Sequence, residues 1–370
     1  MTHELELQAD ETILRGSVLV LLQFNVCESI HLDQMRDLIS ARKAGQPTPK
    51  HPAPEYMRYN APPVVAPLEP LVLESGERLE GEVKFFEYGV ASVIFELPFV
   101  GTWSKLIGLA SRWVWEIDFA AQAAAVVRAS LERAAPALVK PYEEWLSEDY
   151  LIFHAREISG SPTVTELIQR HGARIAQVVR GDMGQLAESE CNEVLQSRIS
   201  YYANDLAVIG WNAAFLYDSA SGAETAIQLL EYANSQLLDF RHYDELLTKE
   251  LDRVYKLLDE GTGLFARWRL ARSATRLHTV LLDVAELTEH VDNAIKFLSD
   301  MFSARLYKLA AAKVGVPDYK ELVTRKVHTA EELYRFMVDQ FNQSRAFFME
   351  LTVVIILVIE LVYMFKGMMF

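Results

Sequence analysis

The stretch Ile13-Leu-Arg-Gly-Ser-Val-Leu-Val-Leu-Leu-Gln-Phe-Asn-Val26 is rich in β-branched and large apolar residues, and its apolar positions form no helical stripe. This composition favours a β-strand. The run His31 to Ile39 follows, and its apolar residues recur on one helical face. The N-terminal region is therefore expected to place a long strand before a short helix.

Further strands are expected beyond a proline-rich segment. Residues 45–63 contain six prolines and little apolar periodicity, which is typical of an exposed loop. Strand-like runs resume at Pro70–Leu73 and over Glu82–Leu97, and Pro98 ends the second run. Most of the region up to residue 100 is therefore predicted to be strand.

From Gly101 the pattern changes to helix. Apolar residues between Trp103 and Trp113 recur at helical spacing, and Phe119 to Val139 is rich in alanine. Tyr150–Phe153 predicts one returning strand. Strands followed by helices indicate the α+β class, so residues 1–180 are predicted to form a mixed α/β domain.

Residues 185–313 are predicted to form a helical-hairpin or coiled-coil region. One helix is expected to run from Leu186 toward Tyr217 and a second over residues 223–258. A heptad stripe follows, with spacings of four and three residues, at Leu277, Leu281, Val284, Thr288, Val291, Ile295, Leu298 and Phe302. This stripe fits either an intramolecular hairpin with the 223–258 helix or the seam of an oligomer.

The C-terminal segment predicts a membrane anchor. Thr329-Ala-Glu-Glu332 fits a capping box, so a juxtamembrane helix is expected over residues 329–345. Residues 346–365 are almost wholly apolar, and twenty helical residues cover about 30 Å, the thickness of a bilayer's hydrocarbon core. The residues that define this predicted transmembrane helix are Arg345, Glu350, Ile355, Ile359, Glu360 and Lys366.

The prediction for the whole chain is a single-pass membrane protein with most of its mass in the cytoplasm. Its expected partners are the lipid bilayer, a protein that the sequence does not name and further copies of the chain. The alternative is a buried C-terminal helix of a soluble domain. It rests on the uncharged run Leu351–Ile359, which has only nine residues.

Composition narrows the class of function. The chain of 370 residues has 51 acidic and 36 basic side chains and a net charge of -15, which argues against a nucleic-acid-binding surface over the whole protein. Cys27 and Cys191 are expected to be reduced thiols. The acidic N-terminus resembles neither a secretory signal nor a mitochondrial presequence.

Two groups of polar residues are candidate sites. The first is expected to form either a recognition pocket or a hydrogen-bond network between two helices; it comprises Arg198, Asn204, Asp205, Asn212, Arg241 and Asp244. The second is a basic patch that fits RNA or anionic lipid headgroups; it comprises Arg267, Arg269, Arg272 and Arg276. The alternative for the patch is the salt-bridged start of the heptad helix, opposite Glu245, Glu250 and Asp252.

No catalytic motif stands out. The histidines and cysteines lack metal-ligand spacing, the glycines form no phosphate loop, and no nucleophile–base pattern is present, so neither a metal nor a cofactor is expected. The first hypothesis is a non-enzymatic, membrane-anchored scaffold or interaction protein. The alternatives are a peripheral enzyme that uses Asp205 and Asp244, and an RNA- or ribosome-associated tether that uses Arg267–Arg276.

Three blocks occur in a set order along the chain: Phe85–Phe95, Ser197–Leu206 and Arg345–Glu360. Together they resemble the RMND1/Rmd1/Sif2-type family, a domain of unknown function. The resemblance implies an α+β region, a helical coiled-coil region, a C-terminal transmembrane helix and a scaffold role. It assigns family positions to Arg345, Glu350 and Glu360 and to Gly89. The lack of a presequence favours a bacterial relative over a mitochondrial member.

Overall fold

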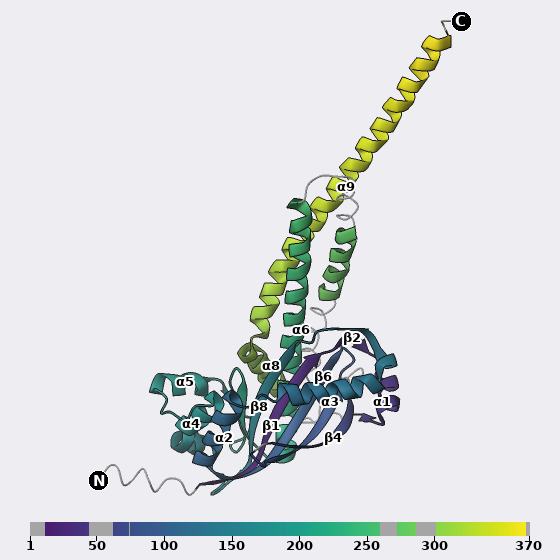
Figure 1. Cartoon of the computed structure of the whole chain (residues 1–370). Coiled ribbons are helices and arrows are strands. Elements are labelled where there is room, and N and C mark those ends of the chain that lie inside the picture. The colour runs from purple at the N-terminus through teal and green to yellow at the C-terminus, as the bar shows by residue number, and fades with distance from the viewer. Residues whose placement is uncertain (1–11, 44–61, 74, 260–271, 286–300, 368–370) are drawn as a thin grey trace. The chain divides into compact units, whose positions relative to one another are not determined.

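The computed structural model describes residues 12–43, 62–73, 75–259, 272–285 and 301–367 (Figure 1). Of residues 259, 340–348, 351, 363 and 365–367 it describes the helical backbone alone. The chain divides into two compact units. The first comprises Met1–His242 with Val291–Tyr319, and the second comprises Tyr243–His290 with Lys320–Phe370.

The first unit is built on a nine-stranded sheet in the order β3-β4-β5-β6-β1-β8-β11-β10-β9. The strands are β1 (Ile13–Asn25), β3 (Arg42–Lys43), β4 (Val64–Val72), β5 (Arg78–Phe85), β6 (Val90–Thr102), β8 (Ser147–Ile158), β9 (Arg198–Ile199), β10 (Leu206–Ile209) and β11 (Ala213–Tyr217). Two further strands, β2 (Cys27–Ile30) and β7 (Leu138–Pro141), pair with each other.

The long predicted strand, β1, lies inside the sheet. It pairs antiparallel with β6 on one side and with β8 on the other, whereas β11 pairs parallel with β8, so the sheet is mixed. Successive side chains of a strand point to opposite faces. The even-numbered residues Val18, Val20 and Leu22 join the apolar core, while the odd-numbered Gln23 and Asn25 are buried on the opposite face.

Helices cover the apolar face of the sheet. They are α1 (Leu32–Ile39), α2 (Trp103–Trp115), α3 (Ala120–Arg133), the 3-10 turn η1 (Ala135–Ala137), α4 (Val164–Arg180) and α5 (Glu188–Gln196). Trp103 is wholly buried here, and its ring centroid lies 5.6 Å from that of Phe215 in β11. The α+β class predicted from the sequence is therefore confirmed.

The opposite face of the sheet meets α6 (Ala220–Asp259), which contributes its N-terminal half to the first unit. Gln23 in β1 and Ser92 in β6 both donate hydrogen bonds to Glu231 of α6. α8 (Met301–Val314) packs on the same helix, because Tyr307 donates a hydrogen bond to Gln236 and its ring lies 5.8 Å from that of Tyr232. A polar layer thus lies under α6.

The predicted helix between Leu186 and Tyr217 is wrong beyond residue 197. The structure places β9, β10 and β11 there, so the sheet continues past the boundary predicted at residue 180. Leu206–Ile209 and Ala213–Tyr217 are short apolar runs, and periodicity alone does not separate such runs from helix. The predicted helix over 223–258 corresponds to α6.

The second unit is helical and contains the rest of α6, a helix over residues 272–285 and most of α9 (Val316–Gly367). Buried apolar side chains from all three form its core: Leu247, Leu251, Val254, Leu277, Val280, Val284, Val323, Ala330 and Met337. Polar contacts join the same helices, since Arg276 Nε lies 2.8 Å from Glu250 Oε1 and Lys326 Nζ lies 2.6 Å from Asp244 Oδ1.

Only part of the heptad stripe can be located. Leu277 and Val284 are buried in the helix over 272–285. Phe302 lies in α8 of the first unit, where its ring is 5.4 Å from that of Tyr201. Thr288, Val291, Ile295, Leu298 and the glycines 261 and 263 lie outside the described residues.

The predicted membrane-spanning helix is wrong. In the part of the chain that the structure describes, no helix combines the length and the apolar character needed to cross a membrane. Glu350 and Glu360 bound an uncharged run of nine residues, which is about 13 Å of helix and less than half of a bilayer's hydrocarbon core. The predictions of a tail anchor and a single-pass membrane location fail with it. The lipid bilayer as a partner stays a prediction.

The predicted helix start at Thr329 is also wrong. α9 begins at Val316 and continues through this residue, with Pro317 in its first turn, where a missing N–H costs little. Thr329 Oγ1 donates to the carbonyl oxygen of Arg325 at 3.1 Å, a bond typical of a threonine inside a helix rather than at its cap.

Candidate functional site

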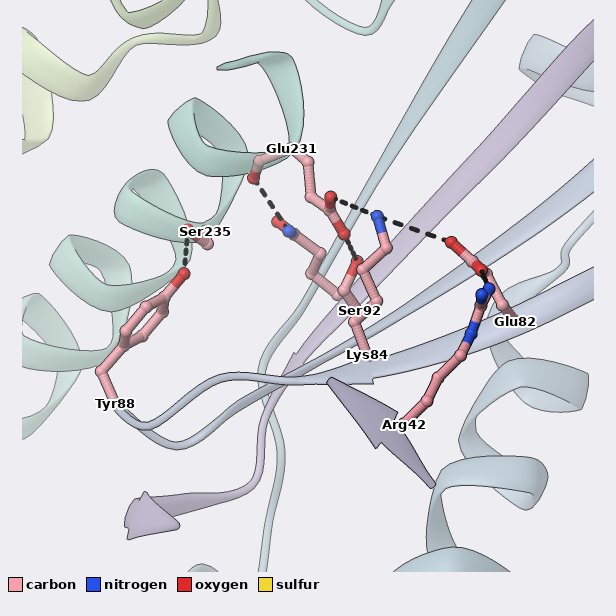
Figure 2. A network of polar contacts seen from close by, with 8 residues as sticks. Arg42, Glu82, Lys84, Tyr88, Ser92, Glu231 and Ser235 are labelled. Atoms are coloured by element: carbon pink, nitrogen blue, oxygen red, sulfur yellow. Dashed lines mark hydrogen bonds and ion pairs between the residues drawn. The ribbon is translucent and has the colours of Figure 1, made fainter. Parts of the chain in front are cut away.

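The polar layer between the sheet and α6 centres on Glu231 (Figure 2). This residue is only 3% exposed. Its carboxylate accepts hydrogen bonds from Lys84 Nζ at 2.8 Å and from Ser92 Oγ at 2.7 Å, and its backbone carbonyl accepts one from Gln23 Nε2 at 2.9 Å. Glu231 therefore joins three strands of the sheet to α6.

Lys84 remains charged in this layer. Burial acts to lower the pKa of Lys84, but the carboxylates of Glu231 and of Glu82, at 3.6 Å, outweigh it and raise the pKa above the ordinary lysine value. Arg42 lies 3.9 Å from the same Glu82 carboxylate (Figure 2). The layer is thus a chain of alternating charges that leads from the buried Glu231 to the surface.

The layer continues toward Asp239. Asn25 Nδ2 donates to Asp239 Oδ1 at 3.4 Å, and Tyr88 Oη lies 3.0 Å from Ser235 Oγ. Burial raises the pKa of Asp239 well above the ordinary aspartate value, so its neutral form is favoured. This end of the layer carries buried hydrogen bonds rather than ion pairs.

A cavity of about 590 Å³ opens beside the layer. We call it the sheet cavity; its walls are residues of β5, β6, β1 and β8 and of the first turns of α6. It is lined by Ser17, Leu19, Glu80, Gly81, Glu82, Lys84, Ile94, Glu96, His154, Arg156, Ala220, Ser221, Glu224, Ile227 and Gln228.

The sheet cavity carries more negative than positive charge. Four of its lining residues are glutamates, and two, Lys84 and Arg156, are cations. His154 adds no charge, because burial lowers its pKa and its Nε2 lies 2.9 Å from the carbonyl oxygen of Asp218, to which it donates as the neutral tautomer. Four carboxylates against two cations leave two negative charges in excess among the lining residues. Arg78 and Arg42 do not line the cavity but lie 3.6 Å from Glu80 and 3.9 Å from Glu82.

The cations of the sheet cavity already have partners within the protein. Arg156 Nη2 lies 2.7 Å from Glu96 Oε1 and 3.2 Å from Ser17 Oγ. Lys84 is bound to Glu231, which lies behind the cavity wall. The arrangement can therefore hold a positively charged group near Glu224, which forms no ion pair with the other described residues, and near Glu80, whose cationic neighbour is the exposed Arg78 at 3.6 Å.

The register of the sheet brings two of these carboxylates together. Glu80 in β5 is the direct antiparallel partner of Glu96 in β6. Like charges directly opposite each other destabilise a sheet. Glu82 lies two residues further along β5, so its side chain projects from the same face.

The first group of predicted site residues is not assembled into one site. Asp205 Oδ1 accepts hydrogen bonds from the backbone N–H groups of Tyr201 and Tyr202, at 2.7 and 3.1 Å, and so shapes its own loop. Arg198 Nη1 donates to the carbonyl oxygen of Leu195 at 2.6 Å. Asn204 is exposed in the loop before β10.

The remaining members are used elsewhere. The backbone carbonyl of Asn212 accepts a hydrogen bond from Leu151 N–H at 3.0 Å. Arg241 forms an ion pair with Glu148 in the first unit. Asp244 belongs to the second unit, where it pairs with Lys326. Asp205 and Asp244 therefore each serve local contacts in different units.

The basic patch and the predicted anchor are only partly described. Arg267 and Arg269 lie outside the described residues, and Arg272 is exposed. Arg276 pairs with Glu250, as expected if the patch is the salt-bridged start of a helix. The side chains of Arg345 and Lys366 also lie outside the described residues. Ile355 and Ile359 are exposed on α9, as are the side chains of Glu350 and Glu360.

Sequence reasoning missed the polar layer, although one signal for it was present. Ser17, Gln23 and Asn25 interrupt the apolar run of β1 at positions an even number of residues apart. Side chains so spaced share one face of a strand, which indicates a polar face on a buried strand. The partners Lys84 and Glu231 could not be identified, because their approach depends on the tertiary structure.

Two chemistries receive little support from the described residues. Among them no group of three or more histidine, cysteine, aspartate or glutamate side chains converges closely enough to hold a metal ion. Burial raises the pKa of the Cys27 thiol to about 12, which leaves it protonated and unreactive near neutral pH.

A curated protein resembles part of this chain. A protein of Methanocaldococcus jannaschii described as "Uncharacterized protein MJ0711" is 20% identical over 215 residues, which span 58% of this chain and 65% of the relative, a little under two thirds of its length. No solved structure matches.

The family model described as "Uncharacterized protein MJ0711, N-terminal domain" matches residues 15–224, more than half of the 370 residues. The matched region runs from β1 to the first turns of α6, so it includes the whole nine-stranded sheet apart from the first residues of β1. It also includes all four carboxylates that line the sheet cavity. The chain therefore belongs to the family of the MJ0711 N-terminal domain.

Proposed function

We propose that the first unit is a non-enzymatic binding module that holds a small organic cation in the sheet cavity. The observation that carries this proposal is the excess of two carboxylates in a cavity of about 590 Å³. Ligand sites in proteins commonly occupy about 300–1,000 Å³. An amine or a guanidinium would form charge-assisted hydrogen bonds with the glutamates.

The pairing of Glu80 with Glu96 supports a cationic ligand. Two carboxylates in direct cross-strand register repel each other. Glu96 Oε1 lies 2.7 Å from Arg156 Nη2, whereas Glu80 Oε1 lies 3.6 Å from the Nε of the exposed Arg78, which does not line the cavity. A bound cation between the strands and Glu224 of α6 would offset this repulsion. An organic cation suits the site better than a bare metal ion, which needs several oxygen ligands at about 2.0–2.6 Å.

The binding module is one form of the interaction protein that the sequence predicts. A protein partner and self-association remain proposals, as do the enzymatic role through Asp205 and Asp244 and the RNA contact through Arg267–Arg276. We also propose that this family is distantly related to the RMND1/Rmd1/Sif2-type proteins. The support is the turn at Gly89, which has φ 82° and joins two strands of the sheet.

Calorimetric titration of the full chain tests the binding module. The probes are putrescine and agmatine as cations and acetate and phosphate as anions. We expect the cations to bind and the anions to give no heat. Glu80→Gln and Glu224→Gln should each weaken cation binding about tenfold, which corresponds to about 1.4 kcal/mol.

Glu132→Gln is the matched control, because Glu132 is an exposed glutamate of α3, on the opposite side of the sheet. This variant should bind the cations as the unmodified chain does. The proposal fails if neither cation binds at concentrations of about 10 mM. It fails equally if the control variant and the cavity variants lose binding to the same extent.

A further inference from the structure

A second cavity of the first unit, of about 450 Å³, opens at the turn between β10 and β11. We call it the turn cavity. The residues that matter for its chemistry are Trp211 in the turn, Ser197 before β9, Arg241 in α6, and Asp318 and Tyr319 in the first turn of α9. None of these residues lines the sheet cavity.

Trp211 is an exposed aromatic side chain on a fixed backbone. The residue is 73% exposed. Both neighbours are held: Gly210 N–H donates to Ala213 O at 2.8 Å, the buried Tyr150 Oη donates to Gly210 O at 3.0 Å, and Asn212 O accepts from Leu151 N–H at 3.0 Å. The hydrogen bonds of the turn therefore hold a large apolar side chain in a solvent-exposed position.

The turn is also fixed by close packing. A Cβ atom at Gly210 would lie 2.6 Å from Val179 Cγ1 and 2.8 Å from Ala213 O, so no other residue fits without movement of the backbone. A rigid turn lowers the entropy that a ligand must remove when it contacts Trp211. The indole is therefore a preorganised surface for stacking.

The walls of the turn cavity carry balanced charge. Three cations, Arg180, Arg241 and Lys313, face three carboxylates, Glu148, Glu193 and Asp318. Arg241 pairs with Glu148, while Arg180 and Lys313 approach Glu193 at 2.6 and 2.8 Å. Because these charges neutralise each other, a multiply charged ligand gains little here.

Asp318 is the wall carboxylate that forms no ion pair with another residue in the part of the chain that the structure describes. It lies next to Tyr319, the second aromatic residue of the cavity. A carboxylate accepts two parallel hydrogen bonds from a group with neighbouring N–H donors. One edge of guanine, with its ring N–H and amino group, has this pattern.

We propose that the turn cavity binds an uncharged, planar heteroaromatic ligand of nucleoside size, which stacks on Trp211 and donates hydrogen bonds to Asp318. Stacking of a base on an aromatic side chain tolerates any base, because every base has a π-face. The Asp318 carboxylate determines which base is preferred, because guanine offers two neighbouring N–H donors on one edge and adenine does not. The sugar of a nucleoside contributes volume, and an added phosphate would contribute little because the wall charges neutralise each other.

The test is calorimetric titration of the full chain with guanosine, adenosine and their 5′-monophosphates. We expect guanosine to bind more tightly than adenosine, and a phosphate to change either affinity by less than about threefold. Trp211→Ala should weaken both nucleosides at least about tenfold. Asp318→Asn should weaken guanosine and leave adenosine nearly unchanged.

Trp115→Ala is the control, because Trp115 is 68% exposed at the end of α2 and lines neither cavity. The Trp211 and Asp318 variants should keep the thermal unfolding midpoint of the unmodified chain, and all three variants should keep its putrescine affinity, so a failure here is separable from a failure at the sheet cavity. The proposal is overturned if no nucleoside binds, if Trp211→Ala binds normally, or if only the monophosphates bind.

Discussion

Asp239 is a buried carboxyl group whose partner is an amide, Asn25, and not a cation. Its raised pKa means that the folded protein binds a proton more tightly than the unfolded chain does. Between the unfolded pKa of about 3.9 and the higher folded value, stability therefore falls as pH rises. Below about pH 3.9 the group is protonated in both states and contributes no pH dependence.

Asp239→Asn should consequently stabilise the protein at neutral pH by about 1–3 kcal/mol, the usual cost of a buried polar group without a full partner. The difference should vanish near pH 3.5, below the unfolded pKa of about 3.9. Urea unfolding at the two pH values measures it. The exposed Asp252→Asn is the control and should show no such difference; equal pH slopes for Asp239→Asn and the unmodified chain would contradict the argument.

Gly89 is required by its turn for two independent reasons. Its φ is 82°, and a Cβ atom would lie 1.9 Å from the carbonyl oxygen of Cys27. Gly76 has a similar φ of 87° but no atom within 4 Å of an added Cβ. Substitution at Gly76 therefore tests backbone strain alone, and substitution at Gly89 tests backbone strain together with steric overlap.

Gly76→Ala should cost about 1–2 kcal/mol, the penalty for a left-handed L-residue. Gly89→Ala should cost more, roughly 3 kcal/mol or above, because the backbone of Cys27 must also move. Chemical denaturation of the two variants measures both. Equal losses would show that the contact with Cys27 relaxes without cost.

At the scale of elements, sequence patterns identified the sheet's centre but not its far edge. β1 was predicted because a run of fourteen residues without a helical stripe leaves few alternatives. β10 and β11 were misassigned because each has only four or five residues, and the pairing of β11 with β8, which attaches both to the sheet, depends on contacts distant in sequence. Short apolar runs take their structure from such contacts.

The same limit explains why the sheet cavity could not be predicted. Its carboxylates come from β5, β6 and α6, and only the register that pairs Glu80 with Glu96 brings them together. The membrane prediction failed for a different reason. The prediction gave more weight to the apolar character of the twenty residues than to Glu350 and Glu360, which leave an uncharged run of only nine residues between them.

The N-terminus of α4 gives a prediction for a single element. Thr163 caps the helix, with its Oγ1 accepting from Glu166 N–H at 3.4 Å, while Glu166 Oε2 accepts from Thr163 N–H at 2.9 Å. These bonds from Thr163 lower the pKa of Glu166. Loss of the cap should therefore cost stability and move that pKa back toward its ordinary value.

Thr163→Ala should destabilise the protein by about 1 kcal/mol. Thr165→Ala, an exposed position in the first turn of the same helix, is the matched control and should change stability by a few tenths of a kcal/mol. Thermal unfolding measures both, and NMR titration follows the Glu166 carboxyl. An unchanged Glu166 pKa in Thr163→Ala would contradict the capping argument.

At the scale of the whole molecule, each unit buries an apolar core of its own. The core of the first unit surrounds Trp103, Phe95 and Phe215, whereas that of the second contains Leu247, Leu277 and other side chains of its helices. α6 contributes residues to both units. Separate cores favour a separate unfolding transition for each unit. The continuous helix α6 favours a single transition of both units.

Calorimetry of paired variants decides between these outcomes. Glu250 is 2% exposed and binds Arg253 at 2.7 Å and Arg276 at 2.8 Å within the second unit. Glu250→Ala should cost that unit about 1–2 kcal/mol, a discounted figure because both arginines regain water. If the cores unfold separately, Glu250→Ala lowers one transition and Gly89→Ala lowers the other. If both variants shift a single transition, α6 couples the units into one cooperative molecule.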